Sequence, residues 1–361
     1  MPLTANVSID LKALRHNLNE VKRLVPAAKV LTAIKADAYG HGILHAAKAL
    51  QETDGFAVAH IAEARRLREA GIDKRILVMS GMPDGDDLAY CGQQQIDLVL
   101  HTQSMVDLIQ QTPLPSPLNI WFKHDSGMHR LGLDDLAMQQ SVLALSDSDK
   151  LAQRFYMTHF SASDAEDNTR TVEQIKRFRS AIDTLPQAPC SLANSAAIIK
   201  GNLGDSDWVR PGIMLYGANP LPPPLFETYP VDLQPVMTLS APVIAIRHIA
   251  AGESVGYNSR WTASRDSVVA TIGIGYGDGY PRHAPDGTPV LINGQRAPLA
   301  GLVSMDMLGV DITNCRDIHI GDKAILWGKG LPAEEIANRA GTITYELFTS
   351  VTARVRREYL D

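Results

Sequence analysis

The segment VLTAIKADAYGHG, residues 30–42, places a single lysine at the point where an apolar run ends. The run Val30–Ile34 is short and partly β-branched, which is typical of a buried strand. Lys35 follows it directly. An amine at the end of a buried strand loses solvent, and this desolvation lowers its pKa from the free value of ~10.4. Because imine formation requires a neutral amine, Lys35 is a candidate for Schiff-base chemistry.

Other side chains that could do chemistry also follow predicted strands. They are Lys123, Arg130, His159, Asn194, Ser195 and Arg210. Catalytic groups of a barrel built from alternating strands and helices gather where the strands end. We therefore expect these side chains to share one rim with Lys35. Each has a structural alternative when taken alone, since a lone histidine at a strand end is usually structural and Ser195 suits a helix N-cap.

A phosphate group could be bound close to Gly212. Gly212 and Ile213 follow Arg210-Pro211 and can offer backbone N–H groups at close range. Ser195 opens a helical turn, whose positive end favours an anion. Tyr39 can add a hydroxyl group. The alternative is that Arg210-Pro211-Gly212 forms only a tight turn with a solvated arginine.

Short apolar strands alternate with helical patterns between residues 30 and 216. The expected strands are Val30–Ile34, Phe56–His60, Ile76–Met79, Asp97–Leu100, Asn119–Lys123, Phe155–His159, Cys190–Ala193 and Asp207–Val209. The helical patterns include Ala62–Ala70, Ser104–Gln111, Leu133–Leu145 and Thr169–Leu185. About eight such repeats predict an α/β fold, a (β/α)8 TIM-type barrel. A doubly wound open sheet is the alternative, but its dinucleotide fingerprint of glycines at the first helix is missing.

The pattern changes after the proline-rich stretch 220–224, which suits a semi-rigid linker. Alternating apolar runs follow at Val243–Ile246, Val268–Ile272, Val290–Ile292 and Ala324–Trp327. Asn293-Gly294 is typical of a hairpin turn, and a helix is expected at Pro332–Ala340. We therefore predict a barrel domain over residues 1–233 and a C-terminal, mainly β domain over residues 234–361.

The composition is that of an ordinary soluble protein. Of the 361 residues, 45% are hydrophobic and 20% are charged, and the net charge of -6 argues against a nucleic-acid partner. Cys91, Cys190 and Cys315 are far apart and lack metal-ligand spacing, so we expect reduced thiols and no metal site. The N-terminal residues do not resemble a signal peptide, and no apolar run approaches membrane-spanning length. We therefore expect a cytoplasmic protein.

Several motifs occur in a fixed order along nearly the whole chain. The first is KADAYGHG at residues 35–42, and the others lie at Lys123–Gly132, Thr158–Phe160, Ala193–Ala197, Val209–Gly217, Val255–Tyr257, Gly275–Arg282 and Val303–Met307. In sequence and in order, these motifs resemble those of alanine racemases, which depend on pyridoxal 5'-phosphate (PLP). The resemblance implies an isomerase that interconverts L-alanine and D-alanine, either to supply D-alanine for peptidoglycan or for alanine catabolism.

The same resemblance implies roles for the residues that act on the substrate. Lys35 is similar to the lysine that binds PLP and serves as one catalytic base. Tyr257 resembles the opposing base, which a second subunit donates. Arg130 would hold the phenolic oxygen of the cofactor and the substrate carboxylate, and the backbone of Met305, also from the second subunit, would complete that site. Lys123 matches a lysine that is carbamylated in some members of the family.

The remaining implied roles concern the cofactor. The residues similar to the phosphate ligands are Tyr39, Ser195, Gly212, Ile213 and Tyr345. Arg210 is similar to the partner of the pyridine nitrogen. His159 resembles the residue that ties this arginine to the catalytic tyrosine. Asn194 lies beside Ser195 in the same motif and is a further cofactor-binding candidate.

Three other functions stay open at this point. A broad-specificity racemase for serine or larger amino acids is the nearest, since Asn258–Trp261 follows Tyr257 where many relatives have smaller residues. A PLP-dependent decarboxylase of the same architecture would carry a reactive cysteine in an acidic motif, a setting that Cys315 lacks. A PLP-carrier protein would lack the β domain. The expected partners are a small amino acid and a second copy of the chain, which form a homodimer with a shared active site, and neither a membrane nor a nucleic acid.

Overall fold

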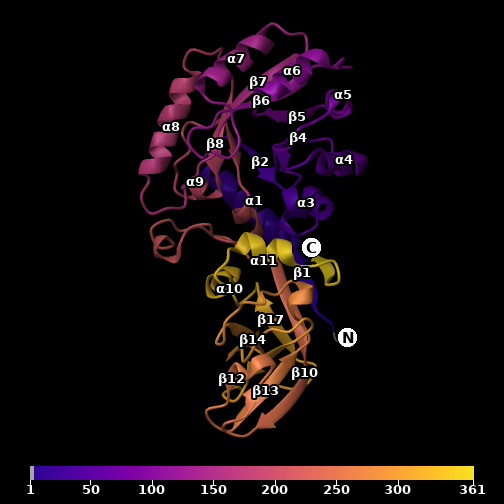
Figure 1. The fold of residues 1–361 in the computed structure, drawn as a ribbon, viewed down its shortest axis with the longest axis vertical. Helices are drawn as coiled ribbons and strands as arrows, with labels where there is room; N and C mark the ends of the chain where they lie inside the picture. The colour runs from indigo at the N-terminus through magenta and orange to yellow at the C-terminus, as the bar shows by residue number, and fades with distance from the viewer. Residues whose placement is uncertain (1–3) are drawn as a thin grey trace.

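The computed structural model describes residues 4–361 of the chain. The barrel lies at one end of an elongated molecule and a β sheet lies at the other, with α10 (Ala333–Ala340) and α11 (Thr344–Ser350) between them (Figure 1). Residues 1–3 of the predicted first domain lie outside the described residues. The predicted class, an α/β barrel with a mainly β C-terminal part, is confirmed.

Eight parallel strands close the barrel. They are β2 (Lys29–Ala33), β3 (Gly55–Val58), β4 (Arg75–Val78), β5 (Ile96–Leu100), β6 (Leu118–Lys123), β7 (Leu151–Met157), β8 (Cys190–Asn194) and β9 (Trp208–Arg210). Each predicted strand is found within a few residues of its expected place. Strands such as β3 and β5 are buried at every position, as expected for strands with both faces covered.

A separate apolar cluster fills the interior of the barrel. It is made of strand residues, namely Leu31, Ala57, Leu77, Val99, Trp121, Phe155, Met157 and Trp208. The rings of Trp121 and Phe155 stack with their centroids 4.3 Å apart. Layers of large side chains from neighbouring strands make such a barrel a packed core rather than a pore. Because this interior is filled, we expect a cavity beyond it, at the carboxyl ends of the barrel strands.

Helices cover the outside of the barrel. They are α1 (Leu11–Leu24), α3 (Ile43–Ala49), α4 (Ile61–Glu69), α5 (Gly85–Gln94), α6 (Gln103–Gln111), α7 (Asp135–Ser146), α8 (Thr169–Ile182) and α9 (Ser195–Ile199). Acidic N-caps fix several of their starts, since Asp10 accepts the Ala13 N–H at 2.9 Å and Asp134 accepts the Ala137 N–H at 2.8 Å. Within residues 4–361, no helix has the length and apolar character needed to cross a membrane.

The C-terminal sheet has eight strands and recruits one from the N-terminus. They are β1 (Asn6–Asp10), β10 (Met237–Ile249), β13 (Ser267–Ile272), β14 (Pro289–Ile292), β15 (Gln295–Pro298), β16 (Leu308–Asp311), β17 (Lys323–Trp327) and β18 (Arg356–Leu360). Strand β1 pairs antiparallel with β10 and parallel with β18. The sequence analysis did not predict β1, whose partners lie more than two hundred residues away along the chain.

The predicted β runs and the hairpin are confirmed. The four alternating runs fall in β10, β13, β14 and β17, and Asn293-Gly294 joins β14 to β15 with positive φ at both residues. The predicted helix is α10, with Pro332 before it and the left-handed Gly341 after it. A two-stranded ribbon, β11 (Ser254–Val255) with β12 (Trp261–Thr262), extends from this part of the molecule.

Candidate active site

Lys35 lies at the carboxyl end of β2 and begins α2 (Lys35–Tyr39), a turn of unusual conformation. Ala36, Asp37, Ala38 and Tyr39 have φ of 54°, 53°, 55° and 52°, so the turn is left-handed. A left-handed conformation costs an L-residue about 1–2 kcal/mol. Such strain persists only where the surrounding structure holds it. The sequence analysis noted the two glycines nearby but did not predict this turn.

Two elements far apart in the sequence, α4 and β18, hold the left-handed turn. The Ala36 N–H donates to Glu63 Oε1 at 2.7 Å, from the first turn of α4. The Arg357 guanidinium donates from β18 to the Gly40 carbonyl at 3.1 Å. Gly40 must be a glycine, because a Cβ there would lie 2.2 Å from the Phe348 carbonyl oxygen. Glu63 and Arg357 were missed from the sequence, since only the fold brings them to Lys35.

A cavity of about 1130 Å³ opens at the strand-end rim. Its lining includes Lys35, Tyr39, Lys123, Arg130, His159, Asn194, Ser195, Arg210, Gly212, Ile213 and Tyr345. The structure thus brings together every candidate residue of the sequence analysis except Tyr257 and Met305. The rule that chemical groups gather where barrel strands end accounts for this convergence.

Four basic groups of this cavity, Lys35, Lys123, Arg130 and Arg210, lie close enough to affect one another's charge. Burial lowers the pKa of Lys35, and the neighbouring charges of Arg130 and Arg210 lower it further, while Glu63 opposes them. Burial, followed by the charges of Arg210 and Arg130, lowers the pKa of Lys123 to about 8. Both lysines therefore hold a larger share of the neutral amine than free lysine does at neutral pH.

Arg210 is fixed at the end of β9 and is only 5% exposed. Its Nη2 donates to the carbonyls of Thr158 and Leu192 at 2.6 and 3.2 Å, and its Nη1 donates to the Ser191 hydroxyl. Burial lowers its pKa to about 10, so the guanidinium keeps its charge at neutral pH. Nδ1 of His159 lies 3.4 Å from Nη2 of Arg210. Burial, together with the Arg210 charge, lowers the pKa of His159 well below its usual range and keeps the imidazole neutral.

Hydroxyl and backbone donors converge beside Gly212. The Gly212 N–H donates to the Ser195 hydroxyl at 2.8 Å, and a Cβ on Gly212 would lie 2.6 Å from the Tyr39 hydroxyl oxygen. Tyr345 extends the group, since its ring centroid is 5.8 Å from that of Tyr39. Burial raises the pKa of Tyr345 to about 12, so its hydroxyl remains a donor. Asn194 acts locally, because its side chain accepts the Ala197 N–H and caps α9.

These residues fit PLP. The cradle of hydroxyl and N–H groups around Gly212, where a Cβ would block the space, suits a phosphate. The buried guanidinium of Arg210 stands ready for a hydrogen-bond acceptor, and the partly neutral amine of Lys35 suits an aldehyde. The four neighbouring cations Lys35, Lys123, Arg130 and Arg210 suit an anionic cofactor and an anionic substrate.

Tyr257 and Met305 lie away from this cavity in the same chain. Tyr257 follows the ribbon strand β11 and is 69% exposed, and Met305 is 53% exposed in the loop before β16. The ribbon and β13 lie at the end of the molecule opposite the barrel (Figure 1). One chain therefore does not bring these two residues to Lys35, and the predicted shared site requires a second copy.

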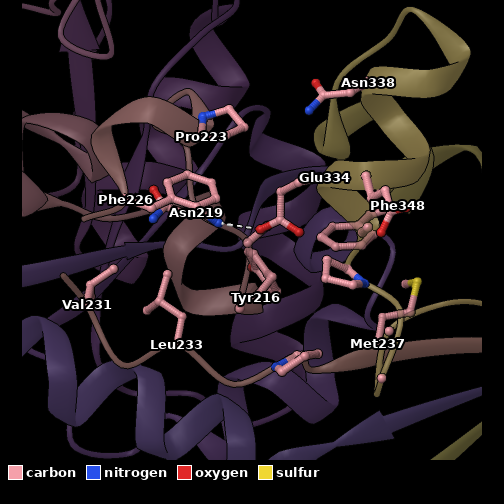
Figure 2. Close-up of a pocket in the computed structure, with 18 of the residues that line it drawn as sticks. Tyr216, Asn219, Pro223, Phe226, Val231, Leu233, Met237, Glu334, Asn338 and Phe348 are labelled. Carbon is pink, nitrogen blue, oxygen red and sulfur yellow. Dashed lines mark hydrogen bonds between the residues drawn. The ribbon is translucent and has the colours of Figure 1, made fainter. Parts of the chain in front are cut away.

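A second cavity, of about 750 Å³, lies between the linker after the barrel and α10 (Figure 2). Its walls are mostly apolar, with Tyr216, Phe226 and Phe348 among them. Glu334 and Glu335 are its acidic residues, and Glu334 accepts the Asn219 N–H at 2.7 Å. Burial raises the pKa of Glu334. Asn219, Phe226 and Glu334 also line the first cavity, so the two cavities share a wall.

A half-buried lysine beside a phosphate cradle, at the rim of a barrel followed by a β domain, defines a class of PLP-dependent barrel enzymes. The family model for the alanine racemase N-terminal domain matches residues 9–220, and the model for the C-terminal domain matches residues 236–359. The alanine racemase of Vibrio atlanticus is 45% identical over 357 residues, which cover 99% of each chain. The chain therefore belongs to the alanine racemase family.

Solved structures agree with this assignment. The biosynthetic alanine racemase of Pseudomonas aeruginosa matches with a TM-score of 0.95 and 41% identity, covering 99% of each chain. The alanine racemase of Bartonella henselae with covalently bound pyridoxal phosphate matches with a TM-score of 0.90 and 30% identity, covering 99% of this chain and 100% of the other. PLP is the cofactor of this family, as the sequence resemblance implied.

Proposed function

We propose that this chain is an alanine racemase that uses PLP to interconvert L-alanine and D-alanine. The observation that carries the proposal is the rim cavity, where a lysine with a lowered pKa, two arginines and a phosphate cradle meet in a member of the alanine racemase family. The curated relatives at more than 40% identity are named alanine racemases, so a broad-specificity racemase is not favoured.

The bound cofactor would supply an electron-withdrawing ring system that makes the α-proton of the amino acid acidic. Racemisation then needs a base on each face of the substrate Cα, one to remove the proton and one to return it. Lys35 Nζ would serve on one face. Tyr257 Oη of a second copy would serve on the other. The neutral share of Lys35 supports its role, because only a neutral amine accepts a proton.

Other residues of the rim would hold the cofactor and the substrate. The phosphate would be held by Tyr39, Ser195, Gly212, Ile213 and Tyr345. Arg210 would face the pyridine nitrogen with its charge retained, and His159 would orient Arg210. Arg130 would bind the substrate carboxylate together with the backbone of Met305 of the second copy. Asn194 would contribute indirectly: its side chain caps α9, and this cap fixes the position of Ser195, the first residue of that helix.

The proposal extends to the assembly. We infer a homodimer in which each sheet domain delivers Tyr257 and Met305 to the barrel of the other chain, supported by the exposure of both side chains. We also propose that the barrel domain ends at residue 233 and the C-terminal domain begins at residue 234. Strand β1 then belongs to the first domain by sequence but pairs with β10 in the sheet of the second. We propose a cytoplasmic enzyme, and the net charge of -6 supports the proposal that it has no nucleic-acid partner. Its product would serve peptidoglycan, or its substrate would enter alanine catabolism.

A chiral assay tests the function. Purified protein with PLP should convert L-alanine or D-alanine to equal amounts of both, and should act far less on L-serine. Lys35→Ala should lower kcat by about a thousandfold or more, since it removes both the covalent anchor and a base. Borohydride reduction followed by peptide mapping should find the pyridoxyl group on Lys35. A label on another side chain, or equal turnover of serine, would contradict the proposal.

A further inference from the structure

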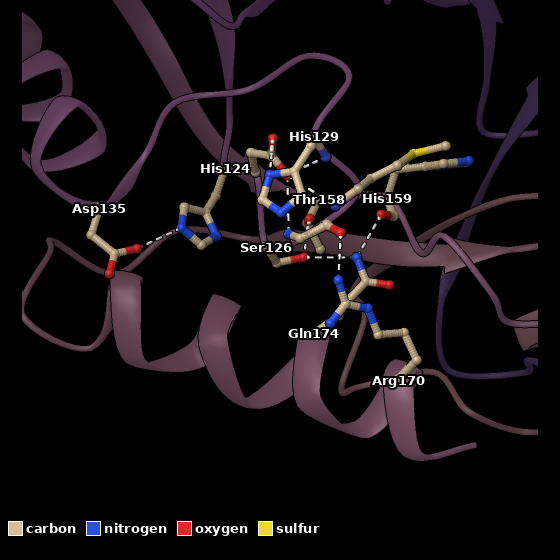
Figure 3. Close-up of polar contacts among 11 residues, drawn as sticks. His124, Ser126, His129, Asp135, Thr158, His159, Arg170 and Gln174 are labelled. Atoms are coloured by element: carbon tan, nitrogen blue, oxygen red, sulfur yellow. Dashed lines mark hydrogen bonds and ion pairs between the residues drawn. The ribbon is translucent and has the colours of Figure 1, made fainter. Parts of the chain in front are cut away.

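We propose that Gln174 is a positioning residue that braces, from behind the site, the loops carrying Arg130 and His159. Gln174 lies on α8, and its side chain is fully buried. It hydrogen-bonds to no side chain that we propose to hold the cofactor or substrate, but it donates to the backbone carbonyl of His159 (Figure 3). This inference rests on the proposed racemase function and adds to it a residue outside the cavity lining.

Every hydrogen-bonding direction of the Gln174 amide is used. Nε2 donates to the Ser126 hydroxyl at 3.3 Å and to the His159 carbonyl at 3.2 Å. Oε1 accepts the Ser161 N–H at 2.8 Å and the Ser161 hydroxyl at 3.1 Å. Ser126 lies in the loop after β6, and His159 and Ser161 lie in the loop after β7. One buried amide therefore ties these two loops to each other and to α8.

The brace continues to Arg210. The Ser126 and Thr158 hydroxyls are 2.7 Å apart, and the Thr158 carbonyl accepts from Nη2 of Arg210 at 2.6 Å. The same Nη2 lies 3.4 Å from His159 Nδ1. A shift of the loop after β7 would therefore move His159 and Arg210 together.

Hydrogen bonds between side chains and the backbone also hold the loop after β6, as far as His129, the residue before Arg130. Asp125 Oδ1 accepts the N–H groups of Gly127, Met128 and His129, each at 3.0 Å. Arg170, on the same helix as Gln174, donates to the Gly127 carbonyl at 2.9 Å (Figure 3). Helix α8 therefore hydrogen-bonds to this loop at Ser126 and at Gly127. Arg130 follows three residues after Gly127.

The best test is Gln174→Glu, which changes almost no volume. The new side chain keeps an acceptor for Ser161. Burial keeps its carboxyl protonated, so it has one O–H donor in place of two and cannot donate to both the Ser126 hydroxyl and the His159 carbonyl. One of these two buried groups therefore loses its partner. A displacement of about 1 Å at reacting groups can cost about a hundredfold in rate. We expect kcat/KM for alanine to fall by about a hundredfold, with kcat lowered through Arg210 and KM raised through Arg130.

The matched control is Gln110→Glu, on α6. It makes the same chemical change at an exposed amide, which donates to the Ala144 carbonyl outside the site. Its kcat and KM should stay within about twofold of wild type. Ser126→Ala is the second variant, because it removes one link of the brace and leaves the core apolar packing intact. It should show the same direction of change in both constants at a smaller size.

Thermal unfolding and the circular dichroism of bound PLP separate positioning from folding. We expect Gln174→Glu and Ser126→Ala to bind PLP with an altered dichroic signal at a temperature where both are folded. A folded Gln174→Glu with kcat/KM within threefold of wild type would overturn the inference. If that variant does not fold, unchanged kcat, KM and dichroism in Ser126→Ala would overturn it instead. A wild-type chain that fails to racemise alanine would refute the proposed function, and no variant is needed for that result.

Discussion

At the scale of single residues, the environment of Lys123 disfavours a positive charge on its amine and would favour a negative group there. Its amine is buried at the end of β6 and shares the rim with Lys35, Arg130 and Arg210, whose charges all disfavour another cation. With a pKa of about 8, roughly a tenth of the amine is neutral at pH 7, compared with far less than a hundredth for free lysine. A neutral amine can react with carbon dioxide to give a carbamate and a proton, which turns the positive group into a negative one.

We therefore predict that Lys123 is carbamylated, as in some members of the family. The pKa of Lys123 is lowered, so the neutral amine is scarce at pH 6 and becomes the main form above pH 8. Occupancy of the carbamate should rise with pH across this interval. Carbon-13 NMR of protein held in labelled bicarbonate should show one protein-bound carbamate signal. Lys123→Arg should lack it, and a signal that survives in this variant would contradict the assignment.

Residue identities at the rim could be predicted from the sequence, but their contacts could not. Lys35, Lys123 and Arg210 each stand next to an apolar run, and the rule for barrel strand ends places them together. The hydrogen bond from Gly212 to Ser195 and the role of Gln174 depend on the packing of loops far apart in the sequence. No local pattern marks such contacts, because a buried glutamine and a surface glutamine look alike in a sequence.

At the scale of elements, the left-handed turn after β2 is the feature that a sequence analysis could not find. Ala36 and Ala38 are residues that rarely adopt positive φ, so their types argue against the conformation they take. The turn forms because Glu63 and Arg357 bind its backbone, and each comes from a distant element. The barrel strands, by contrast, were predictable because each is a short apolar run with a turn after it.

Gly40→Ala tests how tightly this turn is packed. The substitution adds left-handed strain and a Cβ that would lie 2.2 Å from the Phe348 carbonyl oxygen. We expect the free energy of unfolding to fall by roughly 2–5 kcal/mol, the sum of strain and overpacking. Denaturant titration of the cofactor-free protein measures this change. PLP binding should weaken as well, since the turn carries Lys35.

Gly71→Ala is the matched control for that experiment. Gly71 has a similar φ of +75°, but a Cβ there would meet no atom within 4 Å. It should cost only the backbone strain, about 1–2 kcal/mol. If both variants lost the same stability, the contact with Phe348 would contribute nothing and the argument for a tightly packed turn would be wrong.

At the scale of the whole molecule, the long axis separates the two side chains that we propose as the bases for one substrate. Lys35 lies at the barrel rim, and Tyr257 lies in the ribbon region of the sheet end (Figure 1). The C-terminal part also exposes the large side chains of Tyr276, Met305 and Met307, as a surface that is covered in an assembly would. A dimer with two-fold symmetry would pair the barrel rim of each chain with the sheet end of the other.

Subunit complementation tests this arrangement. Lys35→Ala and Tyr257→Phe should each be inactive alone, because each lacks one of the two bases at every site. In a dimer of one chain of each kind, one site combines both substitutions and the other combines the intact Tyr257 with the intact Lys35. After unfolding and refolding an equal mixture, half of the dimers should be mixed, so about a quarter of all sites should be intact. Activity near a quarter of wild type supports the shared site. A mixture that stays inactive, although native mass spectrometry shows mixed dimers, means that both bases must come from one chain.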